Sequence, residues 1–206
     1  NNEKVENLLE KLFCVTSING LLKYLYETQK NKLDHINTIH LYNVTQYMNL
    51  DINARRNLEI TEKLRDKSKK GTLLWVLDKT STSMGGRLLR RWLNDPLVDC
   101  KKINERLEAV KELKDNVILR GEIIELLKKV YDVERLAGKI SYGSANARDL
   151  ISLKNSAKQL PDIKKVISET KSKYLRSLYE ELDTLDDVYK VIDDAIGEEP
   201  PLGVKE

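Results

Sequence analysis

The sequence has few of the residues that mark secreted, membrane-spanning or disordered proteins. Among its 206 residues are two cysteines, four prolines and one phenylalanine. Cys14 and Cys100 are far apart and form no CxxC pair, so free thiols in a reducing compartment are expected rather than a disulfide framework. No run of about 18 apolar residues could span a bilayer, and the N-terminus lacks the apolar segment of a signal peptide. We therefore expect a soluble, cytoplasmic protein with no membrane partner.

An excess of charge of one sign is also lacking. The formal net charge is only +3, although 33% of the residues are charged. A domain dedicated to nucleic-acid binding is usually more basic than this. The low content of glycine and proline excludes collagen-like and low-complexity chains and favours helices. The length suits one large domain or two small ones, because domains usually contain about 100–200 residues.

Apolar residues recur at intervals of three and four over most of the chain, which is the spacing of an amphipathic helix. Asp99 and Asp132 are suitable first residues for two of these helices, and Thr72 can cap a short helix after it. Pro161 predicts a kink or a new helix start, and Gly197 predicts the end of the last helix. The predicted helical stripes cover residues 4–13, 21–32, 53–60, 73–77, 84–93, 103–113, 123–130, 133–140, 150–160, 163–167, 175–182 and 185–196.

Three segments interrupt this helical pattern. Residues 16–20 read as a turn, and residues 66–71 read as a basic loop. Residues 37–50 contain several strand-favouring side chains without helical spacing, which predicts one or two short strands. We therefore predict an all-α fold, an elongated multi-helix bundle with a small β patch near residues 39–50.

Motifs for catalysis and cofactor binding are incomplete. A phosphate-binding loop needs GxxxxGK[ST], but the one Gly-Lys pair, Gly138-Lys139, is followed by isoleucine and has Val133 in place of the first glycine. Gly85-Gly86 lacks the rest of a dinucleotide-binding motif, and SETK at 168–171 lacks the other elements of the SxxK enzymes. We therefore expect no catalytic residue and no cofactor in this chain.

Metal ligands are equally sparse. His35 and His40 lie five residues apart in a segment not predicted to be helical, and the two cysteines are distant in sequence. A structural zinc site needs about four converging nitrogen and sulfur ligands. No metal site is predicted.

Two basic clusters are the candidate contact residues. Arg87, Arg90 and Arg91 share one face of a predicted helix. Lys67, Lys69 and Lys70 belong to the basic loop. Either cluster can contact DNA phosphates or another domain. The alternative is a solvated face, with the arginines paired to acidic residues such as the nearby Glu59 and Glu62. Neither cluster has interleaved aromatic residues that stack on bases.

Several sequence blocks are distinctive in their order and spacing. The longest are RNLEITE at 56–62, GTLLWVLDKT at 71–80 and MGGRLLRRWL at 84–93. Shorter blocks are LKYLYETQK at 22–30, PL at 96–97, INERL at 103–107, DVERL at 132–136, ARDL at 147–150 and QLP at 159–161. In order and in spacing these blocks resemble the core, or lever, domain of the MutS family of bacterial DNA mismatch-repair proteins, and the resemblance covers nearly the whole chain.

The resemblance implies a division into three parts. Residues 1–19 correspond to the end of a connector domain, residues 20–198 to the helical core or lever domain, and residues 199–206 to the approach to a clamp domain. The family usually has a longer segment where this chain has only residues 18–20. The Phe-x-Glu mismatch reader of the family is absent, because Phe13 is followed by Cys14 and Val15.

The resemblance also implies a role. The chain would be a non-catalytic fragment of a mismatch-repair ATPase. It would couple the mismatch-binding and clamp parts of that protein to its ATPase domain. By resemblance, the parent protein would use ATP and Mg, bind mismatched double-stranded DNA, recruit a MutL-type partner and form a homodimer. Two alternatives remain: a freestanding helical adaptor, and an independent DNA-binding module that uses the two basic clusters.

Overall fold

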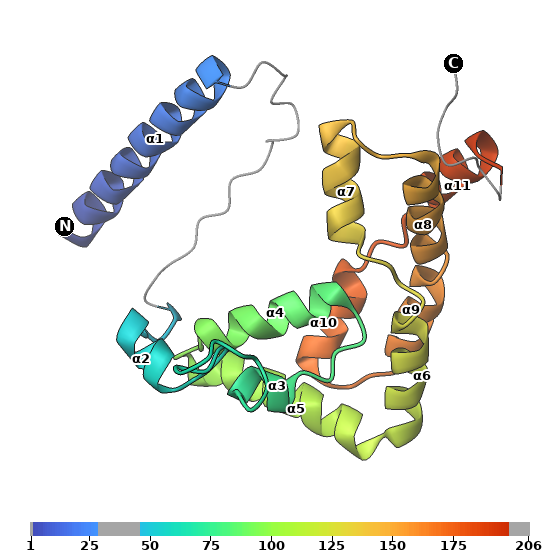
Figure 1. The fold of residues 1–206 in the computed structure, drawn as a ribbon, viewed down its shortest axis with the longest axis horizontal. Coiled ribbons are helices and arrows are strands. Elements are labelled where there is room, and N and C mark those ends of the chain that lie inside the picture. The colour runs from blue at the N-terminus through green and yellow to red at the C-terminus, as the bar shows by residue number, and fades with distance from the viewer. Residues whose placement is uncertain (1, 29–45, 198–206) are drawn as a thin grey trace. The chain divides into compact units, whose positions relative to one another are not determined.

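The fold is all-α, as the sequence predicts. The computed structural model describes residues 2–28 and 46–197, with side chains described for residues 15–28 and 46–197. The chain divides into two units, Asn1–Tyr42 and Asn43–Glu206. Figure 1 shows the described helices, numbered α1 to α11 along the chain.

The first unit contains one long helix, α1 (Asn2–Thr28). The turn predicted at residues 16–20 is wrong, because α1 is continuous through them. Serine, threonine, asparagine and glycine each lower helix stability by only about 0.5–1 kcal/mol, so the helix formers on both sides can extend the helix through them. The Thr28 hydroxyl donates to the Tyr24 carbonyl oxygen at 2.7 Å in the last turn. The domain boundary near residue 19 stays a prediction.

The predicted β patch is reduced to a single bridge within the described residues. Tyr47 and Leu97 form an isolated antiparallel bridge. The Met48 amide donates to the Pro96 carbonyl oxygen at 2.7 Å, and the Val98 amide donates to the Gln46 carbonyl oxygen at 3.2 Å. Residues 37–45 of the predicted patch lie outside the described residues. The bridge ties the start of the second unit to the chain after α4.

Four helices follow in the first half of the second unit. Each begins at a residue whose side chain accepts a hydrogen bond from a backbone amide in the first turn, and these N-caps are Asp51, Thr72, Thr82 and Asp99. The predicted caps Thr72 and Asp99 are therefore confirmed. The helices are α2 (Ile52–Asn57), α3 (Leu73–Leu77), α4 (Ser83–Asn94) and α5 (Cys100–Asp115).

Six further helices lie in the rest of the second unit that the structure describes. Asp132 caps α7, as predicted, and Pro161 lies in the first turn of a new helix. Asn146 and Asp149 form a reciprocal capping box at the start of α8. The helices are α6 (Val117–Leu127), α7 (Val133–Tyr142), α8 (Ala147–Ala157), α9 (Leu160–Ile167), α10 (Lys173–Glu181) and α11 (Asp186–Ala195).

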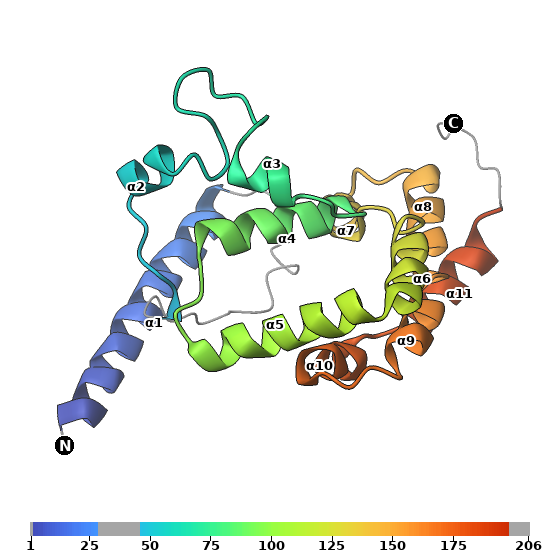
Figure 2. The same ribbon diagram turned by 90° about the horizontal axis from the view of Figure 1, so that it is seen from below.

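The apolar core of the second unit lies where α8 packs between α7 and α11. Leu136, Leu153 and Ile192 are its buried members, one from each helix. Partly buried apolar residues surround them: Val133, Leu150, Val188 and Ile196. Elsewhere α5 packs against α6 and α10, and α6 packs against α9. Figure 2 shows α5 beside α10, and α7 near the N-terminal end of α4.

A candidate contact face on helix α4

Helix α4 carries the arginine cluster and begins at a tight turn. The Thr82 hydroxyl accepts a hydrogen bond from the Gly85 amide at 3.0 Å. A Cβ atom added at Gly86 would lie 3.3 Å from the Thr80 hydroxyl oxygen, closer than most side-chain contacts. The polar connector before α4 therefore lies directly against its first turn. The Asp78 carboxylate accepts from the Thr80 hydroxyl at 2.7 Å and from the Thr80 amide at 3.1 Å, and these two bonds lower the pKa of Asp78.

The first arginine of the cluster is paired with two acidic residues of α7. The Arg87 guanidinium donates to both oxygens of Asp132, at 2.8 and 2.7 Å. It also donates to Oε2 of Glu134 from Nε at 3.1 Å and from Nη2 at 2.6 Å. We call Arg87, Asp132 and Glu134 the Arg87 cluster. A guanidinium binds a carboxylate in this two-pronged way with higher directional specificity than an ammonium can.

The acidic partners differ from those suggested by sequence proximity. Glu59 accepts from the Leu64 amide at 2.8 Å, within the loop after α2. Asp132 and Glu134 lie 45 and 47 residues after Arg87 and are brought to it by the fold. The Arg87 cluster therefore connects α4 to the start of α7.

Asp132 has two partners, because it pairs with Arg87 and also caps α7. Its Oδ1 accepts from the Arg135 amide at 3.2 Å. The hydrogen bond from Arg87 is the main reason why the pKa of Asp132 is lowered from 3.8 to about 2, and the Arg135 amide contributes further. The hydrogen bonds that Arg87 donates to Asp132 and Glu134 raise the pKa of Arg87. Both groups are therefore charged throughout the physiological pH range.

We expect the Asp132→Asn substitution to have a pH-dependent effect on stability. Asparagine is as good an N-cap as aspartate, so the substitution removes mainly the charge that faces Arg87. Since the folded pKa of Asp132 lies below its ordinary value, its contribution is complete above about pH 4 and is lost as the pH falls toward about 2. Urea unfolding at several pH values should show a wild-type advantage near neutral pH that shrinks below about pH 4. An advantage that does not vary with pH would contradict the ion pair.

The other end of α4 is held by two further side-chain links. The Arg106 guanidinium of α5 lies over the Trp92 ring, 3.6 Å from its centroid. Arg55 of α2 pairs with Asp95, the residue after α4, at 3.2 Å. Helix α4 itself has no buried residue. The ion pairs of Arg55 and Arg87 and the cation–π contact of Arg106 thus link α4 to α2, α7 and α5.

The basic loop between α2 and α3 is ordered by its own backbone bonds. Lys67 and Gly71 have positive φ angles of 53° and 89°. Glycine suits the second position because it has no Cβ atom to clash there. The Ser68 amide donates to Asp66 Oδ1 at 3.0 Å, and the Lys63 amide donates to the Ser68 carbonyl oxygen at 3.0 Å. Lys67, Lys69 and Lys70 are all exposed.

The fold brings part of the two basic clusters together. Lys69, Arg87 and Arg90 line one surface groove of about 580 Å³, together with Lys79 and the half-exposed Trp75. Lys67 lines a different groove, of about 440 Å³, with Arg55 and Arg56.

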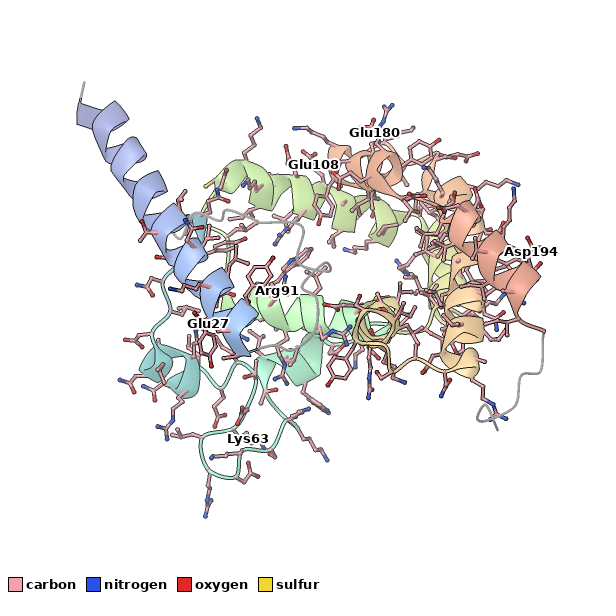
Figure 3. The ribbon with its side chains drawn as sticks, turned by 90° about the horizontal axis from the view of Figure 1, so that it is seen from above. Glu27, Lys63, Arg91, Glu108, Glu180 and Asp194 are labelled. Atoms are coloured by element: carbon pink, nitrogen blue, oxygen red, sulfur yellow. The ribbon has the colours of Figure 1, made fainter. Side chains whose placement is uncertain are left out.

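Lys70 and Arg91 are exposed and line neither groove. Figure 3 labels Arg91 on α4 and Lys63 on the loop. Sequence reasoning missed Lys79 and Trp75 as neighbours of the arginines, because they precede α4 and face it only after the chain turns.

Glycine and lysine at 138 and 139 do not form a phosphate-binding loop. Both residues lie inside α7, where the backbone amides are used by the helix. The Lys139 ammonium pairs with Asp149 of α8 at 2.7 Å. The residues of the incomplete motif therefore join α7 to α8.

Sites of other kinds are lacking within the part of the chain that the structure describes. No group of three or more histidine, cysteine, aspartate or glutamate side chains there could hold a metal ion. Cys100 is a free, exposed thiol. His35 and His40, and the side chain of Cys14, lie outside the described residues. No described helix combines the length and apolarity of a membrane span.

Comparison with known proteins gives a consistent result. Residues 53–206 match the family model described as MutS domain III. The chain is 52% identical over 192 residues to DNA mismatch repair protein MutS of Lachnoclostridium phytofermentans, which covers 93% of this chain and 21% of that protein. It is 52% identical over 200 residues to the protein of the same name from Ruminiclostridium cellulolyticum, covering 97% and 23%.

A third relative aligns with all 206 residues of this chain. DNA mismatch repair protein MutS of Clostridium botulinum strain Okra is 48% identical over 206 residues, which covers 100% of this chain and 22% of that protein. The chain thus spans about a fifth of the length of the curated relatives it matches.

Proposed function

The chain belongs to the MutS family of DNA mismatch-repair proteins and contains its domain III, and on this premise we propose that it is a non-catalytic mechanical link. In this role it couples the DNA-gripping parts of a longer protein to the part that hydrolyses nucleotide. Such coupling is a free energy shared between two binding sites, and it requires an element with two arrangements.

The observation that carries this proposal is the unequal attachment of the helices in the second unit. Helices α7, α8 and α11 share a buried apolar core. Helix α4 has no buried residue and is joined to α7 by the Arg87 cluster. Packed cores are poorly compressible and move as rigid bodies. Exposed ion pairs each contribute little to stability and exchange partners at low cost. In this proposal the Arg87 cluster is therefore the contact at which α4 can move relative to α7.

ATP and Mg are implied for the parent protein by its family, and the residues of this chain do not fit them. Gly138 and Lys139 are used inside α7, and Lys139 is paired with Asp149. No step of nucleotide chemistry is assigned to this chain. The nucleotide site, the mismatch reader and the clamp are proposed to lie elsewhere in the parent.

The remaining proposals concern contacts and partners. Lys67, Lys69, Lys70, Arg90 and Arg91 are proposed to contact DNA or another domain of the parent, while Arg87 holds α4 to α7. The proposed domain division is 1–19, 20–198 and 199–206. The parent is proposed to bind mismatched DNA, to recruit a MutL-type partner and to act as a homodimer in the cytoplasm.

We expect the 206-residue chain alone to hydrolyse no ATP and to bind duplex DNA weakly. Fluorescence anisotropy with matched and mismatched duplexes at two salt concentrations measures the binding, and phosphate release measures hydrolysis. If the chain is a mechanical link, it should bind duplex DNA weakly and with the same affinity whether or not the duplex contains a mismatch. A DNA-binding module, the rival function, predicts tight binding whose log affinity falls by about 0.9 per phosphate contact for each log unit of salt.

Each result has a clear meaning. Hydrolysis by the purified chain would contradict the proposed non-catalytic role. Tight, mismatch-selective binding would place recognition in this chain and make Arg90 and Arg91 the first residues to substitute.

A further inference from the structure

A third surface groove lies between α6 and α9, on elements that the proposed role does not use. Its volume is about 770 Å³. The apolar side chains Ile118, Leu119, Leu126 and Val166 contribute to its lining. Because α6 and α9 are packed against each other, the groove is a valley between two neighbouring helices. A third helix can pack into such a valley, with apolar side chains at every third or fourth position.

Helix α6 is more apolar than its contacts explain. Seven of its eleven residues are valine, isoleucine or leucine. A helix that is apolar on all sides is normally buried on all sides. Among the described helices, α6 packs against α5 and α9, yet Val117 is 62% exposed and Ile118 is 76% exposed. An apolar patch of this kind, with polar residues around it, is typical of an interaction surface.

The polar residues around the apolar floor are mainly acidic. Glu122 and Glu125 lie on α6, Asp162 lies on α9 and Glu169 follows it, against a single lysine, Lys165. Glu125 is paired with Lys128 at 2.6 Å. Glu122, Asp162 and Glu169 form no ion pair with any residue that the structure describes.

Local structure accounts for one of these carboxylates. Asp162 lies in the first turn of α9, where a negative charge favours the helix dipole. Glu122, within α6, and Glu169, beyond α9, have no such role. Three unpaired negative charges around an apolar floor attract a positively charged partner and disfavour an acidic one.

We propose that the α6–α9 groove is a docking site for an amphipathic helix of a partner protein, with an apolar face and flanking lysine or arginine residues. The apolar face fills the floor at Ile118, Leu119 and Val166. The flanking cations pair with Glu122, Asp162 and Glu169. This site is separate from α4 and the Arg87 cluster, so its test does not depend on the proposed coupling role.

The test uses a fluorescein-labelled helical peptide of about 18 residues, long enough to form a helix. Its leucines lie at positions i, i+3, i+4 and i+7, and its flanks carry lysines. A control peptide has the same leucines with glutamate in place of each lysine. Anisotropy titration of the 206-residue chain should show that the lysine peptide binds about tenfold or more tightly than the glutamate peptide. The difference should shrink at high salt, because the Debye length falls from about 10 Å at 0.1 M to about 3 Å at 1 M.

Two pairs of variants locate the site. Ile118→Asp should weaken binding of the lysine peptide about tenfold or more. Val191→Asp, on the similarly exposed Val191 of α11 (68%), should leave it unchanged. Glu122→Lys with Glu169→Lys should weaken the lysine peptide and strengthen the glutamate peptide. Glu180→Lys on α10, labelled in Figure 3, is the matched charge control. Circular dichroism checks that each variant keeps its helix content.

Three results would overturn the proposal. The first is equal binding of the two peptides, which would indicate an unspecific apolar surface. The second is loss of binding in Val191→Asp or Glu180→Lys equal to that in the groove variants. The third is a sedimenting dimer of the chain that Ile118→Asp converts to monomer, which would make a second copy the occupant.

Discussion

Replacing Leu153 with alanine is expected to lower the free energy of unfolding by about 2–5 kcal/mol. Leu153 of α8 is only 7% exposed and lies between Leu136 of α7 and Ile192 of α11. Truncation to alanine removes the buried apolar surface that joins these three helices and leaves a cavity that they fill only in part. Urea denaturation followed by circular dichroism measures the change.

The matched control is Leu107→Ala on α5. Leu107 is 58% exposed, so its truncation should change the stability by less than about 0.5 kcal/mol. Equal effects of the two substitutions would contradict the position of the core. The comparison also tests whether α7, α8 and α11 unfold as one unit, since a separate transition in one helix would give a biphasic curve.

Replacing Glu112 with alanine is expected to cost about 1–3 kcal/mol of stability. Glu112 of α5 accepts from the amides of Lys171 and Ser172, at 2.6 and 2.7 Å. These bonds hold the start of α10, whose N-cap Ser172 makes no side-chain capping bond of its own. Burial raises the pKa of Glu112, but the amide bonds and the charge of Lys171 outweigh it, so the pKa is lower than usual.

Glu112→Gln keeps an acceptor oxygen and should recover about half of the loss. Glu108→Ala is the control on the same helix, because Glu108 is exposed and, unlike Glu112, accepts no hydrogen bond from the amides at the start of α10. Thermal unfolding monitored at 222 nm gives the order of the variants. If Glu112→Ala were no less stable than Glu108→Ala, the two bonds that Glu112 accepts would not be what holds the start of α10.

Most helices of the second unit were predictable because their signals are local. Apolar spacing located α5 to α11. Thr72 and Asp99 were identified as caps from a few neighbouring residues, and a helix start was placed near Asp132. The prediction of a turn at residues 16–20 was wrong, also because of local signals. Residues with weak turn preferences there are overruled by the helix formers on both sides.

The candidate contact face was predictable only in part. Helical spacing correctly placed Arg87, Arg90 and Arg91 on α4. It could not identify Asp132 and Glu134 as the partners of Arg87, because pairs more than 40 residues apart depend on how α4 and α7 are packed. The groove that joins Lys69 to Arg90 likewise depends on the chain reversal between α3 and α4. No local pattern encodes either arrangement.

The most direct test of the proposed link is the coupling between mismatch binding and nucleotide hydrolysis in a full-length protein that carries this chain. The measured quantity is the ratio of hydrolysis rates with mismatched and matched duplexes, for wild type, Arg87→Ala and Asp132→Asn. Lys111→Ala, an exposed position on α5, is the control. Arg87→Ala and Asp132→Asn remove the same ion pair, so their effects should not add.

We expect Arg87→Ala to lower this ratio about fivefold or more, since allosteric coupling is typically worth about 5- to 150-fold. The basal hydrolysis rate of Arg87→Ala should stay close to that of wild type. Lys111→Ala should match wild type both in the ratio and in the basal rate. An unchanged ratio in a folded Arg87→Ala protein would contradict the claim that the link between α4 and α7 transmits the state of the DNA.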